Sequence, residues 1–583
     1  MSSASVSIAI AGYGGTGVIT TGQLLLTACT KSGYFGLAQR SFGPQIRGGE
    51  SLSLLRFSTQ QVLSADDTYK LLVLLDTDHV DRFSAEVPLD KNSLVVIGKN
   101  DAGVPDFVEK SGAQVIHIPL EKLASETSDG GENIVTAGLL ACYLGIEKSV
   151  IRTVLNDHFK EKPSLLEQAK QWLETGWNCA ISAPDRLDIA LSDATQKGPN
   201  WLVNGSEACG YGALKAGIRF VAAYPITPAS GVLEWLAPNI EELGGSLIQA
   251  EDELASINMI IGASFGGIPS LTATSGPGLA LMSESIGLAV ASETPLVIVN
   301  VMRGGPSTGI PTKSEQSDLN IALHGLHGDA PHLVTAMLSI ADSAFTTGWS
   351  VFLAEHLQVP VITLSDQSLA QSDASITQPD LWQLQPERLT APHSDAPYDR
   401  YALTESGISP MSIPGDEDMM YVADGLEHNA HGTPSAASEM HASQLSKRAH
   451  KLSDYDYGEY WAEINGEGSH VIICWGSLSS VAKEAAGRLT ASGTPCKVIA
   501  LRLLAPLQVD AILAALQGAE HIVVVEQSHG AQFMAWLRSH IDFPCSAKSL
   551  SIAGPLPIRP SHIIDSLMQT ESPAQEIEHV ANC

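Results

Sequence analysis

The feature that most constrains the fold is a series of breaks in apolar runs between residues 224 and 318. Tyr224-Pro-Ile-Thr-Pro228, Glu251-Asp-Glu253 and the glycine- and proline-rich stretch 303–313 each follow a short apolar run. Such runs are typical of buried parallel strands, and ligands of open α/β sheets bind at the carboxyl ends of these strands. The pattern predicts an α/β fold in which three loops converge on a small anionic ligand.

Length and charge set further limits. At 583 residues, the chain is long enough for several domains of roughly 100 to 200 residues each. Its 64 acidic and 33 basic side chains give a formal net charge of -31. This charge repels nucleic acid phosphates and anionic membrane surfaces. We therefore expect neither nucleic acid nor a membrane among its partners.

The cysteines and histidines indicate no metal site. Eight scattered cysteines form no Cys-x-x-Cys pair, which argues against a zinc or iron–sulfur site within the chain. His428 and His431 lie in a polar stretch, where simple hydrogen bonding is the commoner role, so we predict no metal ligands. The sequence begins without a basic leader, and no apolar run approaches the roughly 18 residues of a spanning helix. A cytoplasmic location is expected.

The N-terminal region predicts a strand, a glycine loop and a helix. The apolar run 5–11 precedes the loop, and residues 18–29 have the apolar spacing of a helix. Glycines at such a junction allow a phosphate to approach the backbone and the helix N-terminus, although a plain tight turn remains an alternative. Gln39 and Arg40 stand where a dinucleotide site needs an acid, which excludes that ligand. The residues of the loop are Gly12, Gly14, Gly15, Thr16 and Gly17.

A second anion-binding loop follows. Arg40, Ser41 and Arg47 flank exposed glycines in the stretch 41–51. Two arginines beside a glycine-rich helix start suit a phosphorylated carrier such as coenzyme A, whereas a solvated turn is the alternative. Strands at 70–75 and 93–97 and a helix at 133–144 would complete this α/β layer, which we place at residues 1–190.

The central region, residues 200–375, carries the candidate substrate site. Two prolines make 224–228 a stiff turn that presents Thr227 at a strand end. Arg303 stands just beyond the next long apolar strand, where a guanidinium can clamp a carboxylate. Ser307, Thr308 and Lys313 follow as further donors. A structural turn and a surface arginine are the alternatives for the turn and for Arg303.

The acidic triplet 251–253 precedes a predicted helix. Acids at a helix start are usually dipole partners, and this covers Glu251 and Asp252. Glu253 precedes Gly262 by nine residues, and most residues between them are small or apolar. This spacing resembles the pyrimidine-binding domain of thiamine diphosphate enzymes. The resemblance implies that Glu253 hydrogen-bonds the aminopyrimidine ring and that Tyr224, Pro225 and Ile226 line the cofactor.

Four motifs together resemble the α subunit of the 2-oxoacid:ferredoxin oxidoreductases. Gly12–Gly17 and Gly43–Ser51 resemble the γ domain of that family, here fused ahead of α, and the segment 401–452 resembles the 2-oxoglutarate-type members. Pyruvate stays open as a substrate. The four motifs are Tyr224-Pro-Ile-Thr-Pro228, Gln249-Ala-Glu-Asp-Glu253, Thr272-Ala-Thr-Ser-Gly-Pro-Gly278 and Arg303-Gly-Gly-Pro-Ser-Thr-Gly-Ile-Pro-Thr-Lys-Ser-Glu-Gln316.

The resemblance implies a multi-domain α/β fold. A Rossmann-like γ domain is followed by a thiamine-diphosphate pyrimidine-type domain, a linker or insertion at 376–460 without sustained periodicity, and a transketolase C-terminal-like domain at 461–583. In the last domain, Ser528 and Ala531 depart from the Glu-x-Asn-x-x-Gly-Gln pattern often found in the family.

The resemblance also implies half of an active site. The chain lacks a diphosphate motif and cluster cysteines, so a β subunit is expected to carry Mg²⁺, the diphosphate and a [4Fe-4S] cluster in an (αβ)₂-type complex. Thr227 and Arg303 would hold the 2-oxoacid, coenzyme A would be the cosubstrate and ferredoxin the electron acceptor. The reverse direction would fix CO2. A non-catalytic assembly or regulatory subunit and a self-sufficient thiamine decarboxylase are the rival interpretations, and the missing diphosphate motif disfavours the second.

Overall fold

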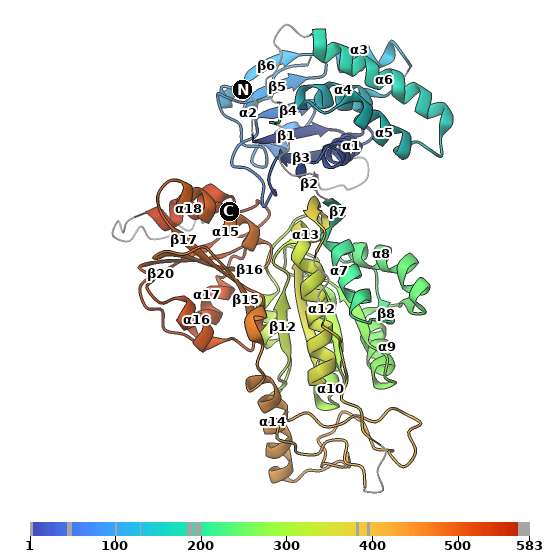
Figure 1. Ribbon diagram of the computed structural model, residues 1–583, viewed down its shortest axis with the longest axis vertical. Helices are drawn as coiled ribbons and strands as arrows, with labels where there is room; N and C mark the ends of the chain where they lie inside the picture. The colour runs from blue at the N-terminus through green and yellow to red at the C-terminus, as the bar shows by residue number, and fades with distance from the viewer. Residues whose placement is uncertain are drawn as a thin grey trace.

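The computed structural model describes residues 4–43, 49–99, 102–128, 130–182, 190–192, 200–379, 384–392 and 397–569, and these form three sheets. Figure 1 shows the N-terminal sheet above the central sheet, with the C-terminal sheet beside the central one. The α/β, multi-domain fold expected from the sequence is therefore confirmed. Among the described helices, none is long and apolar enough to cross a lipid bilayer.

The N-terminal sheet has eight strands in the order β6-β5-β4-β1-β3-β2-β14-β7. Strand β1 runs parallel to β4 and antiparallel to β3. The six strands from the start of the chain are β1 (Ser5–Gly12), β2 (Phe35–Phe42), β3 (Ser51–Ser58), β4 (Leu71–Leu74), β5 (Leu94–Ile97) and β6 (Gln114–His117). Its main helices are α1 (Val18–Lys31), α4 (Glu132–Leu144), α5 (Lys148–His158) and α6 (Pro163–Ser182), with the short α2 (Asp106–Ser111) and α3 (Leu120–Ser125).

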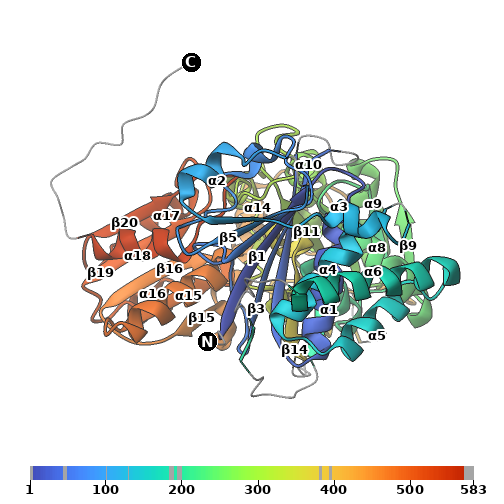
Figure 2. The ribbon, with the colours of Figure 1, turned by 90° about the horizontal axis from the view of Figure 1, so that it is seen from above.

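Two strands from the borders of the central region extend this sheet. Strand β14 (Asp373–Thr377) pairs antiparallel with β2, and β7 (Asn200–Asn204) pairs antiparallel with β14. In the sequence, β7 precedes the central region and β14 follows it. Both ends of the central region are therefore attached to the N-terminal sheet, which holds the two sheets together. Figure 2 shows the fan of N-terminal strands from above, over the central helices.

The central sheet has seven strands in the order β18-β12-β13-β11-β10-β8-β9. Its strands are continuous apolar runs because helices cover both faces of a mostly parallel sheet. The parallel strands are β8 (Phe220–Ala223), β9 (Ser246–Gln249), β10 (Ser270–Thr274), β11 (Leu296–Met302), β12 (Leu333–Ala336) and β13 (Pro360–Asp366). The helices are α7 (Gly205–Lys215), α8 (Ser230–Ile240), α9 (Glu253–Phe265), α10 (Gly276–Ala291), α11 (Leu319–His324), α12 (Ile340–Leu357) and α13 (Gln367–Gln371).

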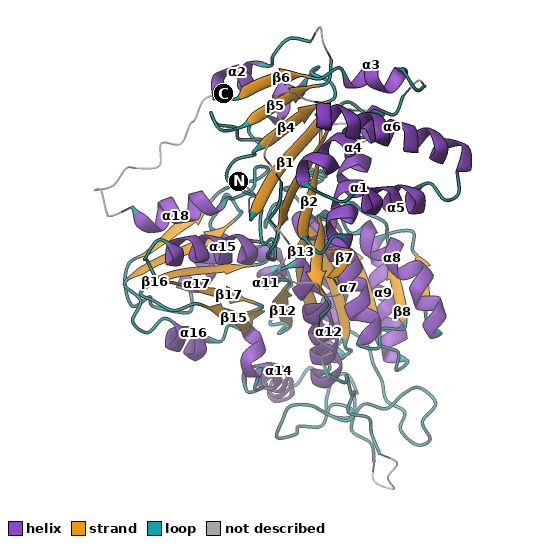
Figure 3. Cartoon of the chain, turned by 45° about the horizontal axis from the view of Figure 1, so that its top comes forward, coloured by secondary structure: helices purple, strands orange, loops and turns teal. Residues whose placement is uncertain are grey.

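The C-terminal sheet has five strands in the order β15-β17-β16-β19-β20. A sixth strand of this region, β18 (Leu503–Ala505), joins the central sheet antiparallel to β12. Figure 3 shows this region as a separate α/β layer. Its strands are β15 (Ala462–Asn465), β16 (His470–Trp475), β17 (Cys496–Leu501), β19 (His521–Glu526) and β20 (Ala547–Ser551), and its helices α15 (Leu478–Ala491), α16 (Val509–Ala515), α17 (Gln532–Arg538) and α18 (Pro560–Met568).

The segment between the central and C-terminal regions is a loop followed by a helix. The described residues from 378 to 437 form loops with two isolated bridges, and α14 (Ser438–Ser453) follows. This helix lacks an apolar stripe because it turns charged side chains inward. Lys447 and Lys451 bind the two oxygens of fully buried Glu293 at 2.6 and 2.9 Å. These cations and Arg400 hold the pKa of Glu293 far below its usual range, and burial lowers the pKa of Lys447 to about 8.

The two histidines of this segment contact neighbouring groups. His428 is buried, its Nδ1 lies 3.1 Å from the Leu426 carbonyl, and its ring lies 3.8 Å from the Tyr401 ring. His431 pairs with the Asp399 carboxylate. Both histidines thus have hydrogen-bonding roles within the loop.

Candidate active site

The three predicted loop segments, 224–228, 251–253 and 303–313, begin at one edge of the central sheet. Ala223 at the end of β8 lies opposite Gln249 of β9, and Thr274 at the end of β10 lies opposite Asn300 of β11. Because these strands are parallel, the loops that follow them lie side by side. The arrangement brings together Thr227, the start of α9, the glycine-containing first turn of α10, and Arg303.

Glu253 is a buried acid beneath the glycine turn. It is the first residue of α9, whose N-cap is Asp252, and its exposure is 6% although it carries a carboxylate. The side chain packs against Gly278, where an added Cβ would lie 2.7 Å from Glu253 Cγ. Within the described part of the chain no group hydrogen-bonds the Glu253 carboxylate. Burial without a partner is costly for an acid, so the carboxylate is available to a ligand.

The neighbouring acids have the ordinary role of acids at a helix start. Asp252 accepts a hydrogen bond from the Ala255 amide at 2.7 Å, and both Glu251 and Asp252 are exposed. The structure therefore separates Glu253 from the other two acids of the triplet by burial.

Arg303 and Thr227 are in direct contact. Arg303 Nη1 donates to the Thr227 carbonyl oxygen at 2.5 Å, although the two residues are 76 positions apart. Arg303 is 7% exposed, its Nε has no partner, and burial lowers its pKa. A guanidinium stays charged in proteins. This arginine is therefore a buried cation with an unused donor, and the alternative of a surface arginine is wrong.

Sequence reasoning missed a polar group beside Arg303. Asn300 Nδ2 donates to Asp318 Oδ2 at 2.9 Å, and Ser317 Oγ lies 3.3 Å from Asp318 Oδ1. Burial raises the pKa of Asp318, while these hydrogen bonds and the Arg303 charge oppose the rise. The available signal was local: Asp318 is a carboxylate between the Arg303 loop and an apolar helix.

Four buried polar atoms at this edge have no partner in the chain. They lie on β10 and β11 or directly after these two neighbouring strands. Buried polar groups are normally hydrogen-bonded, so a local group of exceptions indicates a polar ligand or ordered water. The four atoms are Thr272 Oγ1, Ser275 Oγ, Asn300 Oδ1 and Arg303 Nε.

The three further donors predicted in the Arg303 loop, Ser307, Thr308 and Lys313, lie in different surroundings. The backbones of Gly304 and Ile310 pair across the loop, which leaves Ser307 and Thr308 exposed at its tip. Lys313 points to the N-terminal region, where its Nζ donates to Ser41 Oγ at 2.7 Å and to Glu86 Oε1 at 2.6 Å. The loop thus links Arg303 to the N-terminal sheet. Tyr224 and Pro225 are exposed, and Ile226 is half-buried.

The glycine loop and Arg40 lie at a common edge of the N-terminal sheet. Gly12 and Phe42 both pair with Ser51, so β1 and β2 end at the same edge of the sheet, on either side of β3. Gly17 precedes α1 in the left-handed conformation, φ 74°, and the first turn of α1 has no acid. Gly14, Gly15 and Thr16 form the turn before α1, and Thr16 Oγ1 donates to the Tyr13 carbonyl.

Arg40 has a partner in the structure. Its Nη2 donates to Asp373 Oδ2 at 2.5 Å, from β2 to β14. A cavity of about 80 Å³ lies beside it, lined also by Ser41, Glu86, Lys313 and Gln367. Arg47 lies outside the described residues. The structure therefore brings Arg40, Ser41 and Lys313 together.

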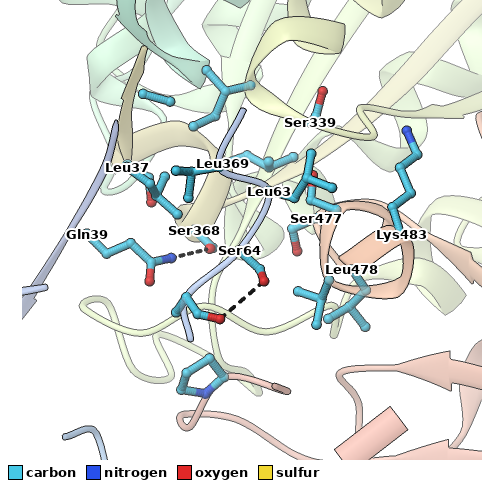
Figure 4. A pocket seen from close by; sticks show the side chains of 18 of the residues that line it. Leu37, Gln39, Leu63, Ser64, Ser339, Ser368, Leu369, Ser477, Leu478 and Lys483 are labelled. Atoms are coloured by element: carbon cyan, nitrogen blue, oxygen red, sulfur yellow. Dashed lines mark hydrogen bonds between the residues drawn. The ribbon is translucent and has the colours of Figure 1, made fainter. Parts of the chain in front are cut away.

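A larger cavity, of about 270 Å³, lies where the three regions meet. Figure 4 shows Leu37 and Ser64 of the N-terminal region, Ser339 and Leu369 of the central region, and Ser477 of the C-terminal region around it. Thr227, Glu253 and Arg303 do not line this cavity. It is distinct from the carboxylate site.

The C-terminal region contacts the site through residues 526–532, the segment in which Ser528 and Ala531 depart from the family pattern. Gln532 Nε2 donates to the Ser317 carbonyl at 3.1 Å, and its Oε1 accepts from the Asn320 amide at 2.9 Å. Gln527 and Gln316 are joined by two hydrogen bonds, one through the Gln316 side chain at 3.0 Å. The C-terminal region thus hydrogen-bonds residues that precede and follow Asp318 in the sequence.

Family models match most of the chain in three parts. Residues 7–179 match the pyruvate ferredoxin/flavodoxin oxidoreductase domain, 211–447 the thiamine diphosphate-binding domain of pyruvate flavodoxin/ferredoxin oxidoreductase, and 461–562 the transketolase C-terminal domain. The 2-oxoglutarate synthase subunit KorA of Archaeoglobus fulgidus is 34% identical over 329 residues, which cover 56% of this chain and 88% of that one. The 2-oxoacid:ferredoxin oxidoreductase subunit alpha of a Sulfolobus species is 29% identical over 590 residues, covering 90% and 91%.

A solved structure is similar over nearly the whole chain. The 2-oxoglutarate:ferredoxin oxidoreductase of Magnetococcus marinus superimposes with a TM-score of 0.90 at 34% identity, covering 97% of this chain and 99% of that one. Fold, site and relatives agree on one class of protein, an oxidoreductase with a thiamine diphosphate-binding domain. The chain belongs to the 2-oxoacid:ferredoxin oxidoreductases. The resemblance seen in the sequence is confirmed.

Proposed function

We propose that the chain is the α subunit of an enzyme that converts 2-oxoglutarate, coenzyme A and oxidised ferredoxin to succinyl-CoA, CO2 and reduced ferredoxin. The observation that carries the proposal is the pairing of a buried Glu253 with the Arg303–Thr227 contact at one sheet edge. The solved Magnetococcus marinus relative contains 2-oxoglutarate, coenzyme A and succinyl-CoA, which supports this substrate set.

The chain's own residues have three roles in this reaction. Glu253 would hydrogen-bond the aminopyrimidine ring of thiamine diphosphate, with Tyr224, Pro225 and Ile226 beside the cofactor. When bound, thiamine diphosphate supplies the carbanion chemistry at the 2-oxo carbon. Arg303 and the backbone turn at Thr227 hold the substrate carboxylate, so that the 2-oxo group is fixed before reaction. In the reverse direction the same groups would hold the product of CO2 fixation.

The residues present fit the cofactor ring. The Gly278 turn leaves no room for a side chain above Glu253, since an added Cβ would lie 2.1 Å from Thr274 Oγ1. The unpartnered oxygens of Thr272 and Ser275 offer further hydrogen bonds beside it. A polar ring with a ring nitrogen suits this combination of one buried acid and free hydroxyl groups.

An apolar surface next to Glu253 favours a β subunit that completes the site. Helix α9 exposes Leu254 and Met259, and α10 exposes Leu281, with exposed fractions of 48, 42 and 52%. A Cβ at exposed Gly262 would meet open space, which allows close approach of another chain. Adjacent exposed apolar side chains of this size mark an interface. We assign Mg²⁺, the diphosphate and a [4Fe-4S] cluster to this partner, in an (αβ)₂ complex that reduces ferredoxin.

The domain roles follow from the same proposal. We assign residues 1–190 to a γ domain that binds coenzyme A through Gly12–Gly17 and Arg40, and residues 200–375 to the cofactor-ring and substrate site. Residues 376–460 form a connection that packs on the central region, and residues 461–583 serve assembly. The hydrogen bonds of Lys313 to Ser41 and Glu86 support a path from coenzyme A to the carboxylate site.

A substrate panel tests the proposed function. We expect the complex of this chain with its β subunit to reduce ferredoxin faster with 2-oxoglutarate than with pyruvate, by at least about tenfold in kcat/KM. A second carboxylate that finds a cation contributes roughly 1.5 to 3 kcal/mol, which corresponds to about tenfold or more. Preference for pyruvate at saturating coenzyme A would overturn the substrate assignment and leave the family unchanged.

Replacement of Arg40 tests the coenzyme A assignment. We expect Arg40→Ala to raise the KM for coenzyme A about tenfold at unchanged KM for the 2-oxoacid, because a charge-assisted bond to phosphate contributes roughly 1.5 to 3 kcal/mol. Lys31→Ala is the matched control, since Lys31 is a basic residue of the same region that pairs with Asp157. Asp373→Asn removes the ion pair of Arg40 and should keep coenzyme A affinity. Equal KM values in the Arg40 and Lys31 variants would refute the assignment.

A further inference from the structure

Asp318 is held in a specific orientation beside the proposed carboxylate clamp. Asn300 donates to one of its oxygens, and the Ser317 hydroxyl contacts the other. Across the site, an added Cβ at Gly276 would lie 2.6 and 2.7 Å from the two Asp318 oxygens. Only glycine at this position in the first turn of α10 admits the carboxylate. The same turn carries Gly278, which packs on Glu253.

In the free site Asp318 Oδ1 has only a shared donor, so this oxygen can also accept a proton. Ser317 Oγ lies 2.9 Å from the Arg303 carbonyl oxygen and 3.3 Å from Asp318 Oδ1. A serine hydroxyl carries one hydrogen, so it cannot donate fully to both acceptors. When Asp318 Oδ1 carries a proton, it donates to Ser317 Oγ, and Ser317 donates to the Arg303 carbonyl. Ser317 Oγ and Asp318 Oδ1 then each have a hydrogen-bond partner.

Two charged side chains, Arg303 and Glu315, act on the ionisation of Asp318. Arg303, at the end of β11, stabilises the ionised form, while Glu315 on the preceding loop repels it. Glu253 faces the same glycine turn from α9, and Asn300 and Ser317 are uncharged. The charge of His529, in the C-terminal region, lowers the pKa of Glu315. Asp318 is only partly buried, so solvent can supply its proton.

We propose that Asp318 is a positioning residue that balances the charge of Arg303 in the free site and takes up one proton when the substrate carboxylate binds there. This inference rests on the proposed role of Arg303 as the substrate clamp. The substrate carboxylate replaces the Asp318 anion as the counter-ion of Arg303, and the proton comes from water. The charge of the site is the same before and after binding.

The sign of the pH dependence follows from this exchange. The pKa of Asp318 is raised by burial and rises further when a second anion faces Arg303. The protonated form binds the 2-oxoacid better, so kcat/KM is highest at low pH. It falls by up to about tenfold per pH unit as pH rises through the pKa of Asp318 in the free enzyme.

The test is the pH profile of kcat/KM for 2-oxoglutarate, measured on the assembled complex with its β subunit. In Asp318→Asn the side chain is always neutral, so this descending limb should be absent. Asp366→Asn is the matched control, because Asp366 is a second buried carboxyl with a raised pKa at this sheet edge. The Asp366 variant should keep the limb. A limb unchanged in Asp318→Asn, or lost equally in Asp366→Asn, overturns the inference.

Two further variants make every outcome decisive. Ser317→Ala removes the acceptor of the Asp318 proton and should move the limb to lower pH, whereas an upward shift would mean that Ser317 serves the ionised form. Arg303→Met should lower kcat/KM at least about 30-fold at every pH, because it removes the charge that the substrate carboxylate pairs with. An unaffected Arg303→Met variant refutes the proposed clamp itself. A large loss there with an unchanged limb in Asp318→Asn refutes only the role of Asp318.

Discussion

Replacing Glu253 by glutamine is expected to lower kcat of the assembled complex by at least about 100-fold with little change in thermal stability. Glutamine keeps the size of the side chain beneath Gly278 and removes its ability to share a proton with the cofactor ring. Proton transfer by a positioned group typically contributes about 10² to 10⁴ in rate. Stability should hold because, among the described residues, no group hydrogen-bonds the Glu253 carboxylate.

The matched control for this substitution is the acid two positions earlier. Glu251→Gln changes the same charge at the same helix start, and Glu251 is exposed whereas Glu253 is 6% exposed. Initial rates of 2-oxoglutarate-dependent ferredoxin reduction at saturating thiamine diphosphate compare the two variants. Near-normal turnover of the Glu253 variant, or equal losses in both, would show that the buried acid does not serve the cofactor.

The largest expected effect is the loss of all activity without a β subunit. The described site has a buried acid and a buried arginine, and the neighbouring helices α9 and α10 expose Leu254 and Leu281, which favours a partner chain over them. An open site also admits water, which weakens the interaction between Arg303 and a substrate carboxylate. On the proposed function, the chain supplies only the half of the site that binds the cofactor ring and the substrate.

Local sequence patterns located the strands that carry the candidate site residues. Glu253, Thr227 and Arg303 each directly follow or closely succeed an apolar strand, and the parallel sheet brings such positions to one edge. The prediction that 376–460 lacks sustained periodicity overlooked α14. Its inward-facing side chains are Lys447 and Lys451, which are stable there only because Glu293, more than 150 residues earlier, meets them. A helix that buries charge has no apolar stripe to detect.

Long-range contacts account for the other differences. Lys313 was assigned to the substrate, and the structure directs it to Glu86, which is 227 positions away. Arg40, which we assign to coenzyme A, also has a partner that the sequence pattern did not reveal, Asp373, 333 positions away. Asp318 gained significance only from Asn300 and Gly276, which the sheet brings beside it. No local spacing encodes such partners.

The most direct test of the half-site account is ferredoxin reduction with 2-oxoglutarate, coenzyme A, Mg²⁺ and thiamine diphosphate by this chain alone, its β subunit alone, and the two mixed. The account predicts activity in the mixture only, and its loss when thiamine diphosphate is omitted. Turnover by this chain alone, or by the mixture freed of thiamine diphosphate, would contradict it.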